Sequence, residues 1–419
     1  MIFAGTLSTQ TWHGVARLAA LAALCLGVQA CASNAGKDSA KPAATATKDS
    51  VKPAAPVSTP GGSVTSAKSI ETATVRDPNA SFIDVKARQA FLKNGKKDAK
   101  LLASLPQEFD CTTAKTVDPQ PGPMVIPPRY AVGNHGDLHP DYERIVALYR
   151  DFEDQAGKLS ALYVSTAKPV YATCLVDLLA KWADGGALLN YDPVKRGQVW
   201  FQTEWSIGVA AQAYSLVMTE PTLDAAKKAR VLDWFSRVSK KQISVPGEKD
   251  GTCCNNHSYW RGLQATMIGV ITKDDELFRW GLNRYVQAIG EIAADGSMPL
   301  EMARHEQALH YQNYALEPMT MIAEIASRQG IDLYAYQVNG RDFHTAVAFL
   351  AAALKDDAVI AKYASEKQDK RAFAPGRGDM GWTEFYQARF KKDPLGFLEQ
   401  PIYYPRNGGA ITMLVYTPK

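Results

Sequence analysis

The sequence lacks the features that mark several large classes of protein. Its 47 basic and 43 acidic side chains leave a formal charge of only +4 over 419 residues, whereas a dedicated nucleic-acid-binding protein carries a concentrated basic stripe. It contains neither the G-x-S-x-G turn of the α/β-hydrolases nor a Walker phosphate-binding loop. We therefore expect no nucleic-acid partner. A small positive balance remains compatible with an anionic polymer as the ligand, because charge near a cleft matters more than the total.

The first apolar run is too short to cross a membrane, which takes about 20 residues. The run Leu18–Val28 follows Arg17 and precedes small residues, a layout typical of a bacterial export signal. The letters VQAC resemble a lipoprotein box that ends at Cys31. We expect residues 1–31 to be a lipoprotein signal with Cys31 lipidated, and cleavage after Ala32 is the alternative. The expected location is periplasmic or outer-membrane-anchored, with the lipid as the only membrane contact.

Aromatic residues are absent from residues 32–80, which are rich in Ala, Pro, Ser, Thr and Lys. Such a composition cannot bury a core. We therefore expect a disordered linker over 32–80 and one folded catalytic domain over 81–419, with folded sequence beginning near Ser81.

Cysteine is scarce, with six residues in all. Without Cys25 and Cys31 of the signal, four remain: Cys111, Cys174, Cys253 and Cys254. An even number in an oxidising compartment indicates disulfides, and four cysteines allow three pairings. We favour Cys111–Cys174 with Cys253–Cys254; two buried free thiols at 253 and 254 are the alternative. No second Cys or His pair lies at ligand spacing, so we expect no metal.

Alternating strand patterns are scarce as well. From residue 141 onward apolar residues recur at helical spacing, as in DYERIVALYRDFEDQAGKL and DELFRWGLNRYVQAIGEI. Only residues 122–128 and 408–416 have the pattern of short strands. Helix after helix with short links predicts an all-α barrel or solenoid of helical hairpins.

Two segments concentrate side chains that can do chemistry. Asn255, Asn256 and His257 lie between a polar loop and a helical run, so we expect them at a helix N-terminus, where one asparagine would otherwise serve only as a cap. In the second segment, Arg304 and Tyr311 are seven residues apart, which places them on one face of a helix. A half-buried tyrosine and a salt-bridging arginine are the alternative there.

Together these segments resemble a known family. CCNNHSYW at 253–260, followed about fifty residues later by R-x6-YxNYAL, is similar to polysaccharide lyase family 5, the alginate lyases. The letters RY at 129–130 and GWTEFY at 381–386 extend the resemblance over residues 122–386. The resemblance implies an (α/α) toroid or incomplete barrel with a deep cleft, periplasmic secretion, no metal cofactor and the same disulfide pairing. We expect no cofactor, a monomer and an anionic polysaccharide as the partner.

The resemblance also implies roles for individual residues. The expected catalytic residues are Asn256 and Arg304 as neutralisers of a substrate carboxylate, His257 as base or carboxylate partner, and Tyr311 as the central acid and base. The expected substrate-binding residues are Arg129 and Tyr130, which match the lid segment of the family, with Tyr259, Trp260, Arg261 and Tyr314. Trp200 and Trp205 are candidates either for stacking on sugars or for the core.

These residue types suit β-elimination of a 4-linked polyuronate. The proton at C5 becomes acidic only when the neighbouring carboxylate is neutralised, which amide, guanidinium and imidazole donors can do. We therefore expect a lyase of mannuronate-rich alginate that yields 4,5-unsaturated products; polyglucuronate and hyaluronate are alternative substrates. Rival hypotheses are a helical-toroid glycoside hydrolase with two carboxylates from Glu204, Glu301 and Glu306, and a non-catalytic polyuronate-binding lipoprotein.

Overall fold

The structure is a computed structural model that describes residues 65–133, 136–192, 197–245 and 252–418. The expected signal, Cys31 and the linker up to residue 64 lie outside the described residues. Within the described part, no helix has the length and apolar character needed to cross a membrane.

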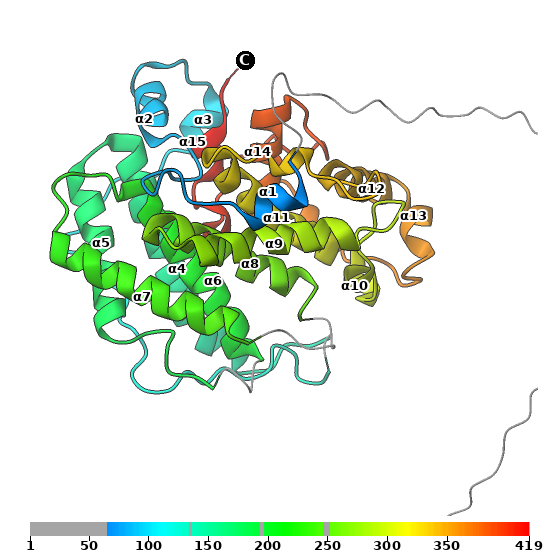
Figure 1. Cartoon of the computed structure of the whole chain (residues 1–419), viewed down its shortest axis with the longest axis horizontal. Helices are drawn as coiled ribbons and strands as arrows, with labels where there is room; N and C mark the ends of the chain where they lie inside the picture. Colours follow the sequence, from blue (N-terminus) through cyan, green and yellow to red (C-terminus); the bar gives the residue numbers. More distant parts are fainter. Residues whose placement is uncertain (1–64, 134–135, 193–196, 246–251, 419) are drawn as a thin grey trace, which may run out of the picture. The chain divides into compact units, whose positions relative to one another are not determined.

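The described residues form helices joined by loops, without a β-strand longer than an isolated bridge. The α-helices, which can be followed in Figure 1, are α1 Ala67–Glu71, α2 Val85–Asn94, α3 Ala99–Ala103, α4 Tyr142–Thr166, α5 Pro169–Asp184, α6 Gln198–Val217, α7 Ala225–Ile243, α8 Asn256–Thr272, α9 Asp275–Glu291, α10 Pro299–Met302, α11 Ala308–Arg328, α12 Phe343–Lys355, α13 Asp357–Ala361, α14 Gly381–Phe390 and α15 Ile411–Val415. Short 3₁₀ helices include η1 His305–Gln307 and η5 Pro405–Asn407.

The long helices lie in two layers. The inner helices α4, α6, α8 and α11 each pack against the next, and α5, α7, α9 and α12 pack outside them. The sequence explains this division, because α6, α8 and α11 are buried on nearly every face. In contrast, α7 buries a single stripe of Val231, Trp234, Phe235 and Val238, the spacing of a helix with one apolar face. The predicted (α/α) toroid is confirmed.

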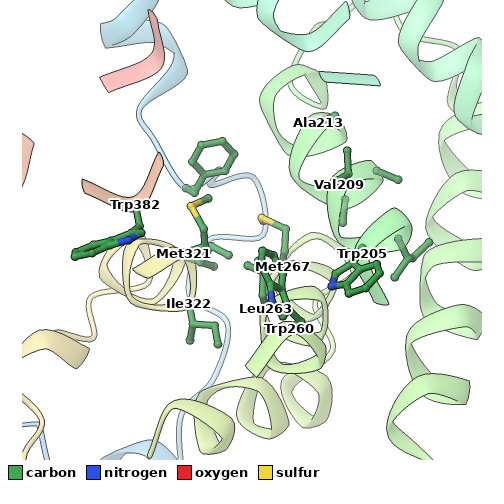
Figure 2. Close-up of a cluster of buried hydrophobic side chains, with 14 of the residues drawn as sticks. Trp205, Val209, Ala213, Trp260, Leu263, Met267, Met321, Ile322 and Trp382 are labelled. Atoms are coloured by element: carbon green, nitrogen blue, oxygen red, sulfur yellow. The ribbon is translucent and has the colours of Figure 1, made fainter. Parts of the chain in front are cut away.

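The centre of the core lies between α6, α8 and α11. Figure 2 shows Trp205 and Val209 of α6 beside Leu263 and Met267 of α8, with Met321 of α11 on the other side. This packing holds the N-terminus of α8 at a fixed place relative to α6 and α11, the three helices that carry most of the site.

Three sequence predictions about the fold are wrong. Residues 122–128 form an irregular segment, and 411–415, expected in a strand, form helix α15. The boundary at Ser81 is also too late, because residues 65–80 contain α1, which packs on α9 and buries Ile70 completely. A lone buried isoleucine in a polar segment has no periodicity, so the sequence pattern could not reveal it.

Both expected disulfides are present. Cys111 is bonded to Cys174 at the start of α5, across 63 residues of sequence. Cys253 is bonded to its neighbour Cys254 directly before α8. The first bridge ties an irregular segment to the helical body, and the second lies beside the residues that begin the candidate site.

Candidate active site

A cleft of about 800 Å³ opens among the inner helices and the loops at one end of them. Six of the ten residues expected in the site line it: Arg129, Tyr130, His257, Arg304, Tyr311 and Tyr314. They come from the loop before α4, the first turn of α8, the turn after α10 and the first turns of α11. Residues distant in sequence are thus brought to one concave surface.

The first turn of α8 presents His257 to the cleft. Asn255 caps this helix, because its side-chain oxygen accepts the backbone N–H of His257 at 3.1 Å. The imidazole stacks on the ring of Phe201, with centroids 3.6 Å apart. Its Nδ1 lies 2.7 Å from Oε1 of Glu204, a residue of α6. The ring is thereby held on one face and on one edge, which leaves Nε2 as its remaining polar atom.

The surroundings of this pair disfavour charge. Burial lowers the pKa of His257 well below its ordinary value of 6.5, and the guanidinium of Arg304 lowers it further. Burial also raises the pKa of Glu204 well above 4.5, although Arg261 and Arg406 act in the opposite direction. A neutral imidazole can donate or accept a hydrogen bond in the cleft, according to which nitrogen carries the hydrogen.

Arg304 and Tyr311 are in contact, but not for the expected reason. They do not share one continuous helix, because α10 ends at Met302 and α11 begins at Ala308. His305 has a φ of 53°, in the left-handed region, and breaks the helix between them. The turn nevertheless places the Arg304 guanidinium 3.7 Å from the centroid of the Tyr311 ring, so that a cation lies directly over the phenol.

The Tyr311 hydroxyl is a weak acid. Burial raises its pKa to about 12, while the cations Arg304 and Arg129 lower it and thus oppose that rise. Neither arginine has a carboxylate within ion-pair distance among the described residues, so both charges remain available to an anionic ligand. Arg129 also lies 5.7 Å from the ring centroid of Tyr130, whose hydroxyl donates to Gln307 at 3.3 Å.

Asn256 does not line the cleft, contrary to expectation. Its side chain is fully buried, and its amide nitrogen donates to both carboxylate oxygens of Glu301, at 3.1 and 3.0 Å. Its backbone N–H donates to the same carboxylate at 2.7 Å. The asparagine therefore joins the start of α8 to α10, and its amide is directed at Glu301 and not at the cleft.

Tyr259, Trp260 and Arg261 are also behind the cleft wall. Each is at most 2% exposed. The hydroxyl of Tyr259 donates to the carbonyl of Cys254, and Arg261 donates to the carbonyls of Val245 and Thr252. Trp260 lies in the core of Figure 2. The expectation that these three contact substrate is thus corrected, because consecutive residues of a buried helix cannot all face one cleft.

The carboxylates proposed for a hydrolase are not placed for that reaction. Glu204 and Glu301 are each 1% exposed, and neither they nor Glu306 line the cleft. Glu204 contacts His257 and Glu301 contacts Asn256. Both therefore support the residues of the first turn of α8.

Sequence reasoning missed several lining residues. Arg150, Arg377 and Arg406 add positive charge to the cleft, and Phe201, Trp205 and His310 add rings. Arg406 lies 4.1 Å from the ring centroid of Trp205 and pairs with Glu153 at 3.2 Å. Of the two tryptophans considered, Trp205 lines the cleft, whereas Trp200 is fully buried. Nothing in the local pattern around Arg406 or Phe201 marks them, since each reaches the site only through the fold.

Comparisons with known proteins agree on one family. The family model described as alginate lyase matches residues 84–360. The crystal structure of alginate lyase A1-III from Sphingomonas species A1 is 59% identical, covers 83% of this chain and 99% of that one, and superposes with a TM-score of 0.80. A polysaccharide lyase of Stenotrophomonas maltophilia is 30% identical over 262 residues, 62% of this chain and 76% of that protein. An alginate lyase of Pseudomonas syringae pv. syringae is 30% identical over 278 residues, 64% and 71% of the two chains.

Because the family model matches more than half of the chain, the chain belongs to the alginate lyase family of polysaccharide lyases. The resemblance that the sequence motifs indicated is thereby confirmed.

Proposed function

We propose that this protein is an alginate lyase that cleaves mannuronate-rich alginate by β-elimination and leaves 4,5-unsaturated products. The observation that carries the proposal is the Arg304 guanidinium placed 3.7 Å over the ring of Tyr311 in a cleft that His257 also lines. This set offers donors for a carboxylate beside a proton-transfer group. The elimination has these two requirements: the carboxylate is neutralised, and a proton is moved from C5 to O4.

The donors serve the first requirement. Removing the C5 proton of a uronate adds negative charge next to an existing carboxylate, so that carboxylate must be neutralised. Arg304 and Arg129, which have no carboxylate partner among the described residues, supply fixed positive charge, and His257 supplies a further polar contact. Donors held in place before the reaction are worth the most, on the order of 10²–10³ in rate for each one. Asn256 donates to Glu301 and thereby holds the first turn of α8 in place.

Tyr311 serves the second requirement. In mannuronate the C5 hydrogen and the glycosidic O4 lie on the same face of the ring, so one group can take the proton and then deliver it. The phenolate of Tyr311 takes the proton from C5, a C4–C5 double bond forms, the C4–O4 bond breaks, and the phenol protonates O4. In guluronate the two positions lie on opposite faces, and a second base would be needed.

Two solved structures support these assignments. Alginate lyase A1-III has been solved with a tetrasaccharide in a Tyr-to-Phe variant and in a His-to-Ala variant, each with a TM-score of 0.82 and 59% identity to this chain. The two substituted residues are separated in that chain by the same number of residues as Tyr311 and His257 are here.

Export as a lipoprotein, with Cys31 lipidated, and a monomeric state complete the proposal. Cys31 and the signal lie outside the described residues, so the support for anchoring is the sequence pattern alone. Labelling with a radioactive fatty acid in cells, with Cys31→Ser as the control, tests the anchor: we expect label in the first protein and none in the second.

The function is tested by incubating the purified protein with polymannuronate, polyguluronate, polyglucuronate and hyaluronate while following ultraviolet absorbance. We expect the fastest rise with polymannuronate, because the unsaturated product absorbs. A faster rise with polyguluronate would contradict the mannuronate preference, and a faster rise with polyglucuronate or hyaluronate would replace alginate as the substrate. Binding of polymannuronate without any cleavage would support the non-catalytic alternative.

A further inference from the structure

Glu204 is buried in the wall of the cleft and has one partner among the described residues. Its side chain is 0% exposed, and Oε1 lies 2.7 Å from Nδ1 of His257. The other oxygen, Oε2, is buried and has no hydrogen-bond partner in the part of the chain that the structure describes. The mechanism above leaves this carboxyl group without a role, although it touches the histidine of the site.

The hydrogen bond between the two residues has two arrangements. If Glu204 is ionised, Nδ1 carries the hydrogen and donates it, and Nε2 presents a lone pair to the cleft. If Glu204 is protonated, Oε1 donates to Nδ1, and the neutral imidazole carries its hydrogen on Nε2. The first arrangement makes His257 a base, and the second makes it a donor.

The contacts favour the second arrangement. An ionised carboxylate at this place would leave a charged Oε2 in the protein interior without a donor, which costs far more than leaving a neutral carbonyl oxygen there. The rings of Phe201 and Trp205 lie beside the imidazole, at 3.6 and 6.0 Å between centroids. Neither ring carries a hydrogen-bond acceptor for the second N–H of a charged imidazole.

The charged and titratable groups around the pair come from every element packed against it: Arg129, Tyr191, Arg261, Arg304, Tyr314 and Arg406. The arginines oppose a positive charge on His257. Arg261 and Arg406 would favour an ionised Glu204, yet burial outweighs them and the pKa of Glu204 remains well above 4.5. Burial thus disfavours the charged form of each group, in agreement with the arrangement in which Glu204 donates.

We propose that Glu204 is a positioning residue that keeps the hydrogen of His257 on Nε2, so that the imidazole donates to the substrate carboxylate and does not act as a base. The inference rests on the proposed function for the identity of that carboxylate. It leaves Tyr311, and not His257, as the proton-transfer group of the elimination. Such a site can act on mannuronate, where one group reaches both C5 and O4, whereas His257 offers no base for the opposite face of guluronate.

The tautomer is measured directly by nitrogen NMR of the protein labelled with ¹⁵N-histidine, with the His257 signals assigned by their loss in His257→Gln. At a pH where the enzyme turns over, we expect a hydrogen on Nε2 and none on Nδ1. A hydrogen on Nδ1, or a charged ring, would overturn the proposal. This readout needs no turnover, so it remains decisive even if the substrate proves not to be alginate.

Two substitutions connect the tautomer to the rate. Glu204→Leu removes the donor at similar volume, and we expect kcat on polymannuronate to fall by on the order of 10², the loss of one preorganised donor, with a smaller share of the Nε2–H form. Glu204→Gln can still donate through its amide, so we expect it to retain most of kcat and most of the Nε2–H form. Glu317→Gln is the matched control: Glu317 is also fully buried, but its contact is with Asn407.

The share of the Nε2–H form and kcat should move together in these proteins, and the control should change neither. Circular dichroism establishes that each variant is folded before it is compared. A Glu204→Leu protein that is folded and retains wild-type kcat would show that Glu204 is only a packing residue.

Discussion

At the scale of single residues, Tyr311 has two roles, because it takes the proton from C5 as a base and delivers it to O4 as an acid. Tyr311→Phe keeps the ring that packs under Arg304 and removes only the hydroxyl. We expect turnover of polymannuronate to fall below detection while oligomannuronate binds with nearly unchanged affinity. Calorimetric titration of the variant measures the second quantity. Turnover close to that of the wild type would remove Tyr311 from the centre of the mechanism.

The basicity of Tyr311 also sets a pH dependence. At pH values below its pKa of about 12 in the free enzyme, the phenolate fraction increases about tenfold for each unit by which the pH rises. We expect kcat/KM, which reports on the free enzyme, to rise with pH through the alkaline range. Arg304→Met removes a cation that lowers this pKa, so the rise should move to higher pH. A wild-type profile that falls over the same range would exclude a phenolate base.

Much of the site could be predicted at this scale, and the residues wrongly assigned to substrate share one cause. His257, Arg304 and Tyr311 were identified by motifs, and all three line the cleft. Asn256 and Arg261 were assigned to substrate because they belong to the same motif. A motif records which residues occur together, whereas the 100° step of a helix decides which of them face the cleft.

At the scale of elements, the junction between α8 and α10 depends on Glu301. Its carboxyl group accepts three contacts from Asn256, one from the backbone and two from the amide. This junction holds the first turn of α8 at α10, immediately before the turn that carries Arg304. The position of His257 relative to Arg304 therefore depends on two buried side chains that do not line the cleft.

Burial raises the pKa of Glu301 from 4.5 to about 7, although the bonds from Asn256 and the charge of Arg304 lower it. The folded state thus holds this proton more tightly than the unfolded state does. The associated stability is present below pH 4.5 and is lost as pH rises through about 7. We expect the unfolding free energy of Glu301→Gln to decrease less between pH 5 and pH 8 than that of the wild type. Urea titrations at both pH values measure it, and equal decreases would contradict the assignment.

The break between α10 and α11 shows why helix boundaries could not be predicted from the sequence. Residues 303–308 contain no glycine or proline, and their pattern predicts a helix. The break is stabilised from far away by Gln368, which donates to the carbonyl of His305 at 2.9 Å and accepts the N–H of Leu309 at 3.0 Å. A partner about sixty residues downstream leaves no local signal.

At the scale of the whole molecule, we expect the bridge between Cys111 and Cys174 to contribute more to stability than the bridge between Cys253 and Cys254. It closes a loop across 63 residues, for which the chain-entropy model gives about 4 kcal/mol. The double variant Cys111→Ser, Cys174→Ser should therefore unfold at clearly lower urea concentration. The matched control removes Cys253 and Cys254, which close no intervening loop and should cost much less. Equal losses in the two double variants would show that loop closure is not the reason.

The helices of the outer layer could be predicted because their apolar residues recur at helical spacing, as do Val231, Trp234 and Phe235 of α7. The cleft could not, because it forms where the first turn of α8, the turn before α11 and the segment around Arg406 meet. That meeting depends on the packing of the inner helices and not on any one of them.

The central claim, that this cleft eliminates and does not hydrolyse, is tested most directly by the products. Polymannuronate is digested in water enriched in ¹⁸O, and the oligosaccharides are analysed by mass spectrometry after brief exposure to the enzyme. We expect products with a C4–C5 double bond at the new non-reducing end and no solvent oxygen at the cleaved bond, because the only transfer is a proton from C5 to O4. Saturated products that carry ¹⁸O would contradict the account.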